Sequence, residues 1–184
     1  MTSKIIGICG VARAGKDSMY EIIDRVFPER NVKRLAFADA LKEECREFLE
    51  SNLGISPFTT NEKEKELIRP FLVTYGTHLR RKLDPDCWIK VVSSTISLDE
   101  GRKNFVITDA RFPNELKWIK ENEGFIIHVS RDGIKPANIE EEENDPLLKE
   151  MSDMVVSLPT FKEDYLIKCK NLIKNKLRNP LIWS

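Results

Sequence analysis

The sequence predicts an α/β fold in which helices cover both faces of a five-stranded parallel sheet. Short apolar runs rich in β-branched residues alternate along the chain with segments whose apolar residues recur at helical spacing. Parallel strands need long crossover connections, and the helical segments between the runs supply them. At 184 residues the chain is also long enough for one domain with a sizeable core.

The expected strands and helices alternate from the N-terminus onward. The strands are the apolar runs at residues 4–9, 32–36, 105–108, 125–130 and 154–158. The helices are expected near residues 15–27, 38–52, 61–82, 86–98, 113–122, 138–151 and 162–178. The first of them carries Met19, Ile22, Ile23 and Val26, which would share one helix face.

Two connections between strands are longer than a simple crossover requires. Residues 37–104 and 131–153 are therefore candidates for a helical substrate-binding insertion and a mobile lid. We expect a single domain, 1–184, that carries the insertion at about 37–104 and the lid at about 131–153. The acidic run at 140–143 inside the second connection is interpreted as a solvated helix face in preference to a metal site.

A glycine-rich segment joins the first expected strand to the first expected helix. It reads Gly10-Val11-Ala12-Arg13-Ala14-Gly15-Lys16-Asp17-Ser18 and matches the G-x-x-x-x-G-K pattern of a phosphate-binding loop. Gly10 and Gly15 permit backbone angles closed to other residues, so consecutive N–H groups can surround an anion at the N-terminus of the next helix. All nine residues are candidate nucleotide contacts, and Lys16 is expected to hold the outer phosphates. The fold class predicted is therefore a P-loop NTPase-like, three-layer α/β/α arrangement.

Asp17 stands where this pattern normally has the Ser or Thr whose hydroxyl binds magnesium, and Ser18 follows one residue later. A carboxylate is itself a magnesium ligand, directly or through water. An acidic side chain in the first turn of a helix is also favoured by the helix dipole. Asp17 therefore has two interpretations, as a metal ligand together with Ser18 or as a stabiliser of the helix start alone.

The third expected strand leads into Thr108-Asp109-Ala110-Arg111-Phe112-Pro113-Asn114-Glu115. Asp109 has the position at which phosphate-loop proteins place a carboxylate to order magnesium. The next residue is Ala110, so the Glu of a hydrolytic motor is absent at that position. Arg111 is a candidate clamp for a phosphoryl group, and the alternative is a structural salt bridge to Glu115.

The first long connection concentrates cations and an aromatic ring. Lys42, Arg69 and Arg80 are candidate ligands of an acceptor phosphate, while Trp88 either lines a nucleobase or fills the core. The whole chain has 30 Lys and Arg against 30 Asp and Glu, so it carries no net field that would favour nucleic acid or membrane partners.

The four cysteines are far apart and show no metal-ligand spacing. We expect free thiols in a reducing compartment, that is, a cytoplasmic protein, or one of the host cytoplasm if the source is viral. The N-terminal apolar run is too short for a membrane span.

Together these segments resemble a known family. GVARAGKDS, FADALK, RPFLVTYGTHLRRKLDPDCW and TDARFPNE occur in the order and at the approximate spacing of the phage-type deoxynucleoside monophosphate kinases, an adenylate-kinase-like branch of the phosphate-loop proteins. The resemblance covers about residues 4–131, and the lid departs from it because residues 139–150 contain no histidine. It implies that ATP and Mg²⁺ are used to convert a deoxynucleoside monophosphate to the diphosphate, and it is compatible with a homodimer. The substrate contacts it implies are Ala38, Asp39, Lys42, Arg69, Gly76, Thr77, Arg80, Trp88, Asp109, Arg111 and Glu115.

The mechanism expected from these residues is electrostatic. The loop N–H groups and Lys16 hold the ATP phosphates, and Mg²⁺ lies near Asp17, Ser18 and Asp109. Arg13, Arg111 and Arg131 are candidates to neutralise charge as the phosphoryl group moves. An acceptor phosphate needs no catalytic base. Two alternatives stay open: another small-molecule kinase, such as a dephospho-coenzyme-A kinase, and a non-catalytic nucleotide-dependent switch.

Overall fold

The computed structural model describes residues 4–99, 103–158, 170–171 and 174–175. Contacts divide the chain into two compact units. Unit 1 consists of Met1–Leu35 and Ile96–Ser184, and unit 2 is Ala36–Thr95. The expected boundaries of the insertion, 37–104, enclose most of unit 2, and the expected organisation as one domain stays a prediction.

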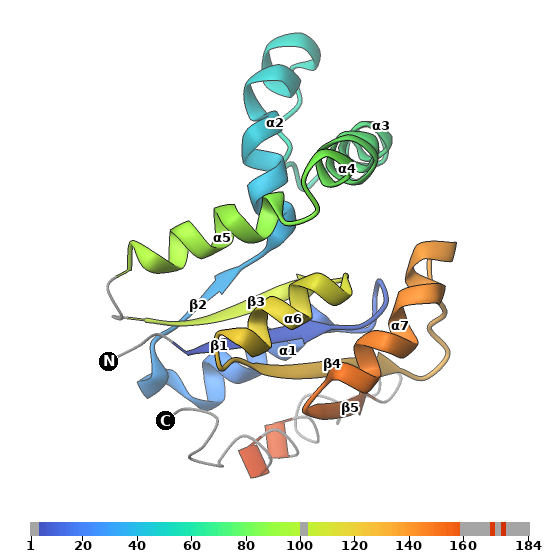
Figure 1. Cartoon of the computed structure of the whole chain (residues 1–184). Helices are drawn as coiled ribbons and strands as arrows, with labels where there is room; N and C mark the ends of the chain where they lie inside the picture. The colour runs from blue at the N-terminus through green and yellow to red at the C-terminus, as the bar shows by residue number, and fades with distance from the viewer. Residues whose placement is uncertain (1–3, 100–102, 159–169, 172–173, 176–184) are drawn as a thin grey trace. The chain divides into compact units, whose positions relative to one another are not determined.

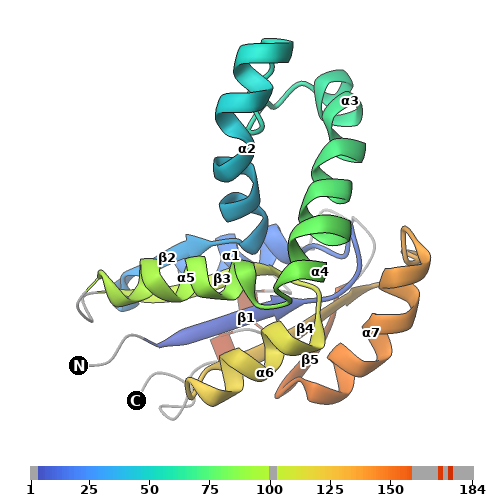
Figure 2. The same cartoon turned by 45° about the horizontal axis from the view of Figure 1, so that its top comes forward.

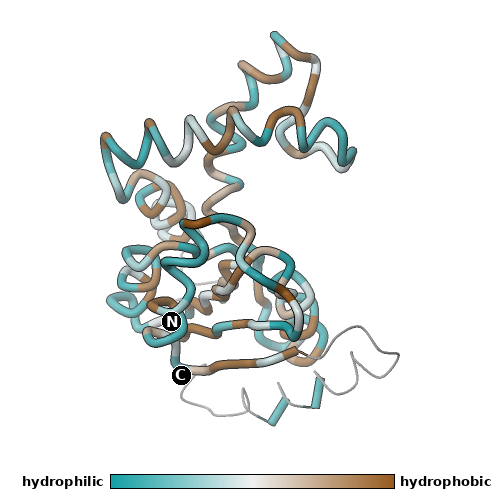
Figure 3. The backbone as a smooth tube through the Cα atoms, turned by 90° about the vertical axis from the view of Figure 1, so that its right-hand side faces the viewer, coloured by the Kyte–Doolittle hydropathy of each residue, from teal (hydrophilic) through white to brown (hydrophobic). Residues whose placement is uncertain are grey.

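Unit 1 contains a five-stranded parallel sheet, which confirms the predicted fold class (Figure 1). The spatial order is β2-β3-β1-β4-β5. The strands are β1 (Ile5–Cys9), β2 (Val32–Leu35), β3 (Asn104–Ala110), β4 (Phe125–Arg131) and β5 (Met154–Leu158). Figure 3 shows brown, hydrophobic stretches along the chain. The central strands β1, β3 and β4 are buried along most of their length, as expected for strands covered on both faces, whereas the edge strand β2 exposes Lys33 and Arg34 and the edge strand β5 exposes every second residue.

Helices cover both faces of this sheet, so the three-layer arrangement is also confirmed (Figure 2). On one face, α1 (Lys16–Val26) packs Met19 and Ile22 into a cluster with Ile6 and Ile8 of β1. On the other face, Gly7 leaves room for α6 (Pro113–Glu121), because an added Cβ would lie only 2.6 Å from a side-chain carbon of that helix. The connections between the strands of this unit also contain α7 (Ile139–Met151), between β4 and β5, and the short 3₁₀ turn Pro28–Arg30, before β2.

The strand order fixes where the chemistry gathers. Strand β1 lies between β3 and β4, so the segments that follow these three strands leave the same edge of the sheet side by side. They are the glycine-rich loop after β1, the Asp109–Arg111 segment at the end of β3 and Arg131 at the end of β4. In open parallel sheets ligands bind at this carboxyl edge.

Unit 2 is helical and has a small core of its own. Cys45, Leu49 and Ile68 are buried together. The ring of Phe71 stacks on Phe48 at 5.2 Å between centroids, which extends the apolar contact between two helices. The elements are α2 (Phe37–Leu53), α3 (Glu62–Val73), a π-helical segment (Thr74–Arg80), α4 (Arg81–Leu83) and α5 (Cys87–Ser97), the last of which runs past the end of the unit.

The single helix expected over 61–82 is interrupted. Regular α-helix extends only over Glu62–Val73, and the chain then widens into a π-helix at Thr74–Arg80. Pro70 lies inside the last turns of α3, where it lacks an N–H donor and crowds the carbonyl one turn earlier. Gly76 within the π segment approaches Leu41 so closely that an added Cβ would lie 2.6 Å from it.

The helix expected at 162–178 falls outside the described residues except at 170–171 and 174–175, which are helical. Among the helices that the structure describes, none combines the length and the apolar composition needed to cross a bilayer.

Candidate functional site

The segment after β1 has the backbone of an anion-binding loop. Gly10 has φ 126° and Gly15 has φ 104°, both in the range that favours glycine, and Arg13 between them has φ 65°. Gly10 also approaches β4 closely, because an added Cβ would lie 2.1 Å from the carbonyl oxygen of Val129. Both glycines of the sequence pattern are therefore required by geometry.

Lys16 begins α1, and its side chain folds back over the loop. Its Nζ donates hydrogen bonds to the carbonyl oxygens of Gly10 and Val11, each at 2.8 Å, and only 8% of the residue is exposed. Burial is the main cause that lowers the pKa of Lys16, and the nearby Arg111 guanidinium lowers it further. A desolvated ammonium group beside a cationic guanidinium gains strongly from an incoming polyanion.

Two carboxylates, Asp17 and Asp109, lie near enough to Lys16 to oppose this lowering of its pKa. The Asp17 side chain is 82% exposed, with its Oδ1 3.9 Å from Arg34 Nε. Asp109 is half-buried in β3. The described residues contain no cluster of three or more His, Cys, Asp or Glu side chains suited to a metal. Mg²⁺ in kinases typically takes only one or two protein carboxylates and completes its shell with phosphates and water, so one exposed and one half-buried carboxylate fit it.

Contacts of both its backbone and its side chain hold Arg111 in place. Its backbone N–H and that of Phe112 donate to Glu115 Oε2, at 2.7 and 3.0 Å. Glu115 is buried in the first turn of α6, so it closes the start of that helix. The Arg111 guanidinium pairs with Glu141 of α7, Nη1 to Oε1 at 3.3 Å, which differs from the salt bridge to Glu115 weighed in the sequence.

Glu141 is a site residue that sequence reasoning missed. Its Oε2 accepts hydrogen bonds from the backbone N–H of Ala12 in the loop and of Ala137, each at 3.0 Å. Its side chain is only 9% exposed, whereas Glu140, Glu142 and Glu143 are exposed, as expected for a solvated face. The cap residue Asn138, whose Oδ1 accepts from the N–H of Glu141 at 2.8 Å, fixes where on the helix this one carboxylate lies.

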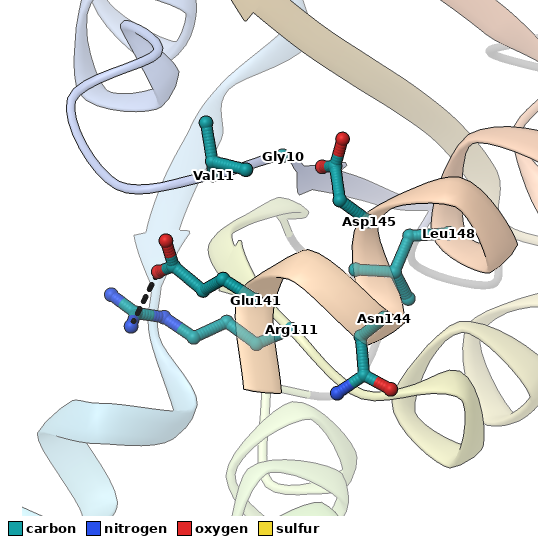
Figure 4. A pocket seen from close by; sticks show the side chains of 7 residues that line it. All are labelled: Gly10, Val11, Arg111, Glu141, Asn144, Asp145 and Leu148. Carbon is teal, nitrogen blue, oxygen red and sulfur yellow. Dashed lines mark hydrogen bonds and ion pairs between the residues drawn. The ribbon is translucent and has the colours of Figure 1, made fainter. Parts of the chain in front are cut away.

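A small pocket opens between the loop and α7 (Figure 4). The figure shows the Glu141 carboxylate directed at the Arg111 guanidinium, near the Gly10–Val11 backbone. The lining residues are Gly10, Val11, Arg111, Glu141, Asn144, Asp145 and Leu148. The predicted loop, Arg111 and the lid segment therefore meet at one place in unit 1.

Polar contacts of buried side chains also connect β1 and β4 to α7 and its C-terminal end. His128 of β4 is 1% exposed, and its Nε2 lies 3.0 Å from Asp145 Oδ1. The Cys9 thiol lies 3.4 Å from the Ser152 hydroxyl, and burial raises the pKa of this thiol to about 11. Cys9, Cys45 and Cys87 are free, as expected, and all three are buried, while Cys169 lies outside the described residues.

The two other predicted arginines occupy different environments. Arg13 is exposed at the tip of the loop. Arg131 is buried at the end of β4, and its guanidinium lies against Gly15, where an added Cβ would approach Nη2 to 2.5 Å. Arg131 therefore lies next to the start of α1, and Arg13 faces solvent.

The residues predicted to bind an acceptor in the first insertion all lie in unit 2, and several have partners within it. Arg80 forms an ion pair with Glu44, Nε to Oε1 at 2.8 Å, and lies over the Trp88 ring at 5.5 Å. Trp88 is buried, and its Nε1 donates to the carbonyl of Gly76 at 3.4 Å, which supports the core interpretation of this ring. Lys42 lies over the Phe58 ring, Arg69 and Ala38 are exposed, and Asp39 and Thr77 are half-buried.

Comparison with known proteins identifies the family. The model of the phosphomevalonate kinase family matches residues 8–125, which is more than half of the chain and includes the loop, β3 and unit 2. Among the curated proteins compared, none matches the chain.

Solved structures of small-molecule kinases are similar to this chain. Dephospho-CoA kinase from Campylobacter jejuni superimposes with a TM-score of 0.51 at 15% identity and covers 96% of this chain and 98% of that one. Shikimate kinase from Acinetobacter baumannii in complex with shikimate gives 0.48 at 12% identity and covers 97% and 95%. The APS kinase CysC of Mycobacterium tuberculosis, as a Cys556Ala mutant, gives 0.44 at 12% identity and covers 97% and 99%. At such identities the first of these likenesses supports the fold alone.

These findings correct one expectation from the sequence. The assignment to the deoxynucleoside monophosphate kinases is wrong, and the deoxynucleotide acceptor that it implied is withdrawn with it, because the family that matches over 8–125 is a different one. The expectation of a phosphate-binding loop rests on the residues alone. The expectation of an ATP-dependent phosphotransferase, which the resemblance implied, agrees with the family found. The chain belongs to the phosphomevalonate kinase family and is an ATP-dependent P-loop kinase.

Proposed function

We propose that this protein transfers the γ-phosphoryl group of ATP to mevalonate 5-phosphate. The observation that carries the proposal is the match of the phosphomevalonate kinase family over 8–125, the part of the chain that includes the phosphate-binding loop. The dephospho-CoA kinase alternative has only a likeness of fold behind it. A non-catalytic switch is disfavoured by membership of a kinase family.

The loop residues suit the donor side of this reaction. The N–H groups of the loop, from Val11 to Lys16, are proposed to hold the ATP phosphates, with the Lys16 ammonium moving from the loop carbonyls to the β- and γ-phosphates. Arg111 and Arg131 are proposed to balance charge on the transferring group. Asp17, Ser18 and Asp109 would hold Mg²⁺, which when bound neutralises phosphate charge.

The acceptor carries a phosphate and a carboxylate, so its site needs cations for two anionic groups. A phosphate oxygen is already a nucleophile, and its attack on the γ-phosphorus would require no general base. The cations of unit 2 are the proposed acceptor ligands. Of these, Arg69 is exposed, whereas Arg80 is held by Glu44 and would have to exchange that partner for the acceptor.

The proposed function is tested by acceptor screening. ADP release should be fast with mevalonate 5-phosphate, undetectable with mevalonate, and lost when Mg²⁺ is chelated. ³¹P NMR of the product should show the paired signals of a diphosphate. Dephospho-CoA and nucleoside monophosphates serve as competing acceptors. Turnover of one of these without turnover of mevalonate 5-phosphate would reject the proposed substrate while leaving a kinase.

Replacement of Arg69 by alanine separates acceptor binding from ATP binding. We expect Arg69→Ala to raise the KM for mevalonate 5-phosphate about tenfold or more, because it removes a planar, doubly donating contact to an anion. The Kd for ATP should be nearly unchanged, since Arg69 lies on α3 and is not part of the loop proposed to hold the ATP phosphates. Calorimetric titration of each ligand alone, beside steady-state kinetics, makes the comparison.

Lys63→Ala is the matched control for this variant. Lys63 is an exposed cation on the same helix, α3, so its replacement by alanine also removes one positive charge. If it raises the acceptor KM as much as Arg69→Ala does, the effect comes from the general field of the helix. A loss of ATP affinity in Arg69→Ala with acceptor affinity retained would reverse the assignment.

A further inference from the structure

Glu141 does to the phosphate-binding loop what a phosphate oxygen would do. Its Oε2 accepts a hydrogen bond from the Ala12 N–H at 3.0 Å, and the Ala12 N–H is one of the backbone donors from which such a loop is built. The same carboxylate pairs with Arg111, a cation proposed for the transferring phosphoryl group. The Glu141 side chain of α7 therefore binds the Ala12 N–H of the loop and the Arg111 guanidinium at the same time (Figure 4).

The contact is specific. Glu141 is held by three partners, namely the N–H of Ala12, the N–H of Ala137 and the Arg111 guanidinium, and little of its side chain is exposed. The neighbouring glutamates of the same helix face solvent. The negative charge of Glu141 also supports the protonated form of Lys16, because it acts against the lowering of the pKa of that residue.

A bound nucleotide cannot share this arrangement. ATP brings several negative charges to the same loop, and at a separation of a few ångströms a carboxylate and a phosphate repel strongly in a partly desolvated site. The Ala12 N–H has one hydrogen to donate, so the two acceptors compete for it.

We propose that Glu141 is an internal competitor of the ATP phosphates. In the absence of nucleotide it occupies the anion position of the loop and holds Arg111 on α7. Binding of the ATP phosphates displaces it, which frees Arg111 for the transferring phosphoryl group and releases α7 from the loop. Glu141 is thus a positioning residue. Its loss should strengthen the binding of ATP and destabilise the protein when no nucleotide is bound.

The test compares Glu141→Gln with Glu140→Gln, which removes the same charge from an exposed position one residue away. Glu141→Gln should lower the Kd for ATP about tenfold relative to the control, because a competitor loses its charge while the loop donors remain. The melting temperature of the nucleotide-free protein should fall, because the pairing with Arg111 is lost. Tighter binding from a less stable protein is a combination that a merely structural residue would not produce.

The phosphates can be separated from the rest of the nucleotide by the choice of probe. Calorimetry with inorganic tripolyphosphate should show the same gain for Glu141→Gln as ATP does, and adenosine should show none. The measurement contains no acceptor, so its outcome does not depend on whether mevalonate 5-phosphate is the substrate. An unchanged or raised Kd for ATP and tripolyphosphate in both Glu141→Gln and Glu141→Ala would overturn the proposal.

Discussion

Lys16→Ala should reduce the rate of phosphoryl transfer by about a hundredfold or more, equivalent to about 3 kcal/mol of transition-state stabilisation. The ammonium is buried and already desolvated by the loop, so its attraction to a developing negative charge is not weakened by water. ADP release at saturating ATP measures this loss. Turnover close to that of the wild type would remove phosphate-loop chemistry from the mechanism.

The substitution also removes contacts of Lys16 within the protein. Lys16 is expected from the sequence to hold the outer phosphates, and in the structure its Nζ donates hydrogen bonds to the carbonyls of Gly10 and Val11. Losing these bonds would cost stability, and removing a buried charge would offset part of that cost. We therefore expect a modest change in melting temperature. Lys33→Ala, which removes an exposed lysine from β2, is the control for charge alone.

The sheet was predictable because its signal is local. The three central strands, β1, β3 and β4, are short apolar runs buried along most of their length, and the five expected strand segments stand between helical patterns. The π-helix at Thr74–Arg80 was not predictable in this way, because its apolar spacing resembles that of an ordinary helix. Within this segment Gly76 also lies so close to Leu41, far away in the chain, that an added Cβ would be 2.6 Å from it, and no local pattern indicates such a contact.

The donor loop was predictable for the same reason, since all its residues are consecutive. Glu141 was not, because four consecutive glutamates look alike in sequence and only the start of the helix at Asn138 decides which of them turns inward. The identity of the acceptor could not be predicted from the sequence motifs either. Pro113 opens α6 and Glu115 closes its first turn, so part of the motif taken as the mark of a nucleotide kinase family is explained by the start of a helix.

Gly10→Ala should destabilise the protein by roughly 3–5 kcal/mol and abolish measurable ATP binding. The first cause is backbone conformation, because φ 126° lies where a residue with a Cβ is strained. The second cause is a collision, since the new Cβ would lie 2.1 Å from the carbonyl oxygen of Val129 in a buried strand. Relief of that collision requires the loop to move away from β4, which takes its N–H groups out of register with a phosphate.

Gly133→Ala is a control that has the backbone strain of a residue at positive φ without a collision of the new Cβ. Gly133 also has positive φ, 78°, but an added Cβ there meets no atom within 4 Å. This control should cost about 1 kcal/mol from the backbone alone and leave ATP binding intact. Chemical denaturation of both variants, followed by ATP titration of whatever remains folded, gives the difference between them. If Gly10→Ala costs no more than Gly133→Ala, the close packing of the loop against β4 is not required. If it is less stable but binds ATP normally, the position of the loop does not control its affinity for phosphate.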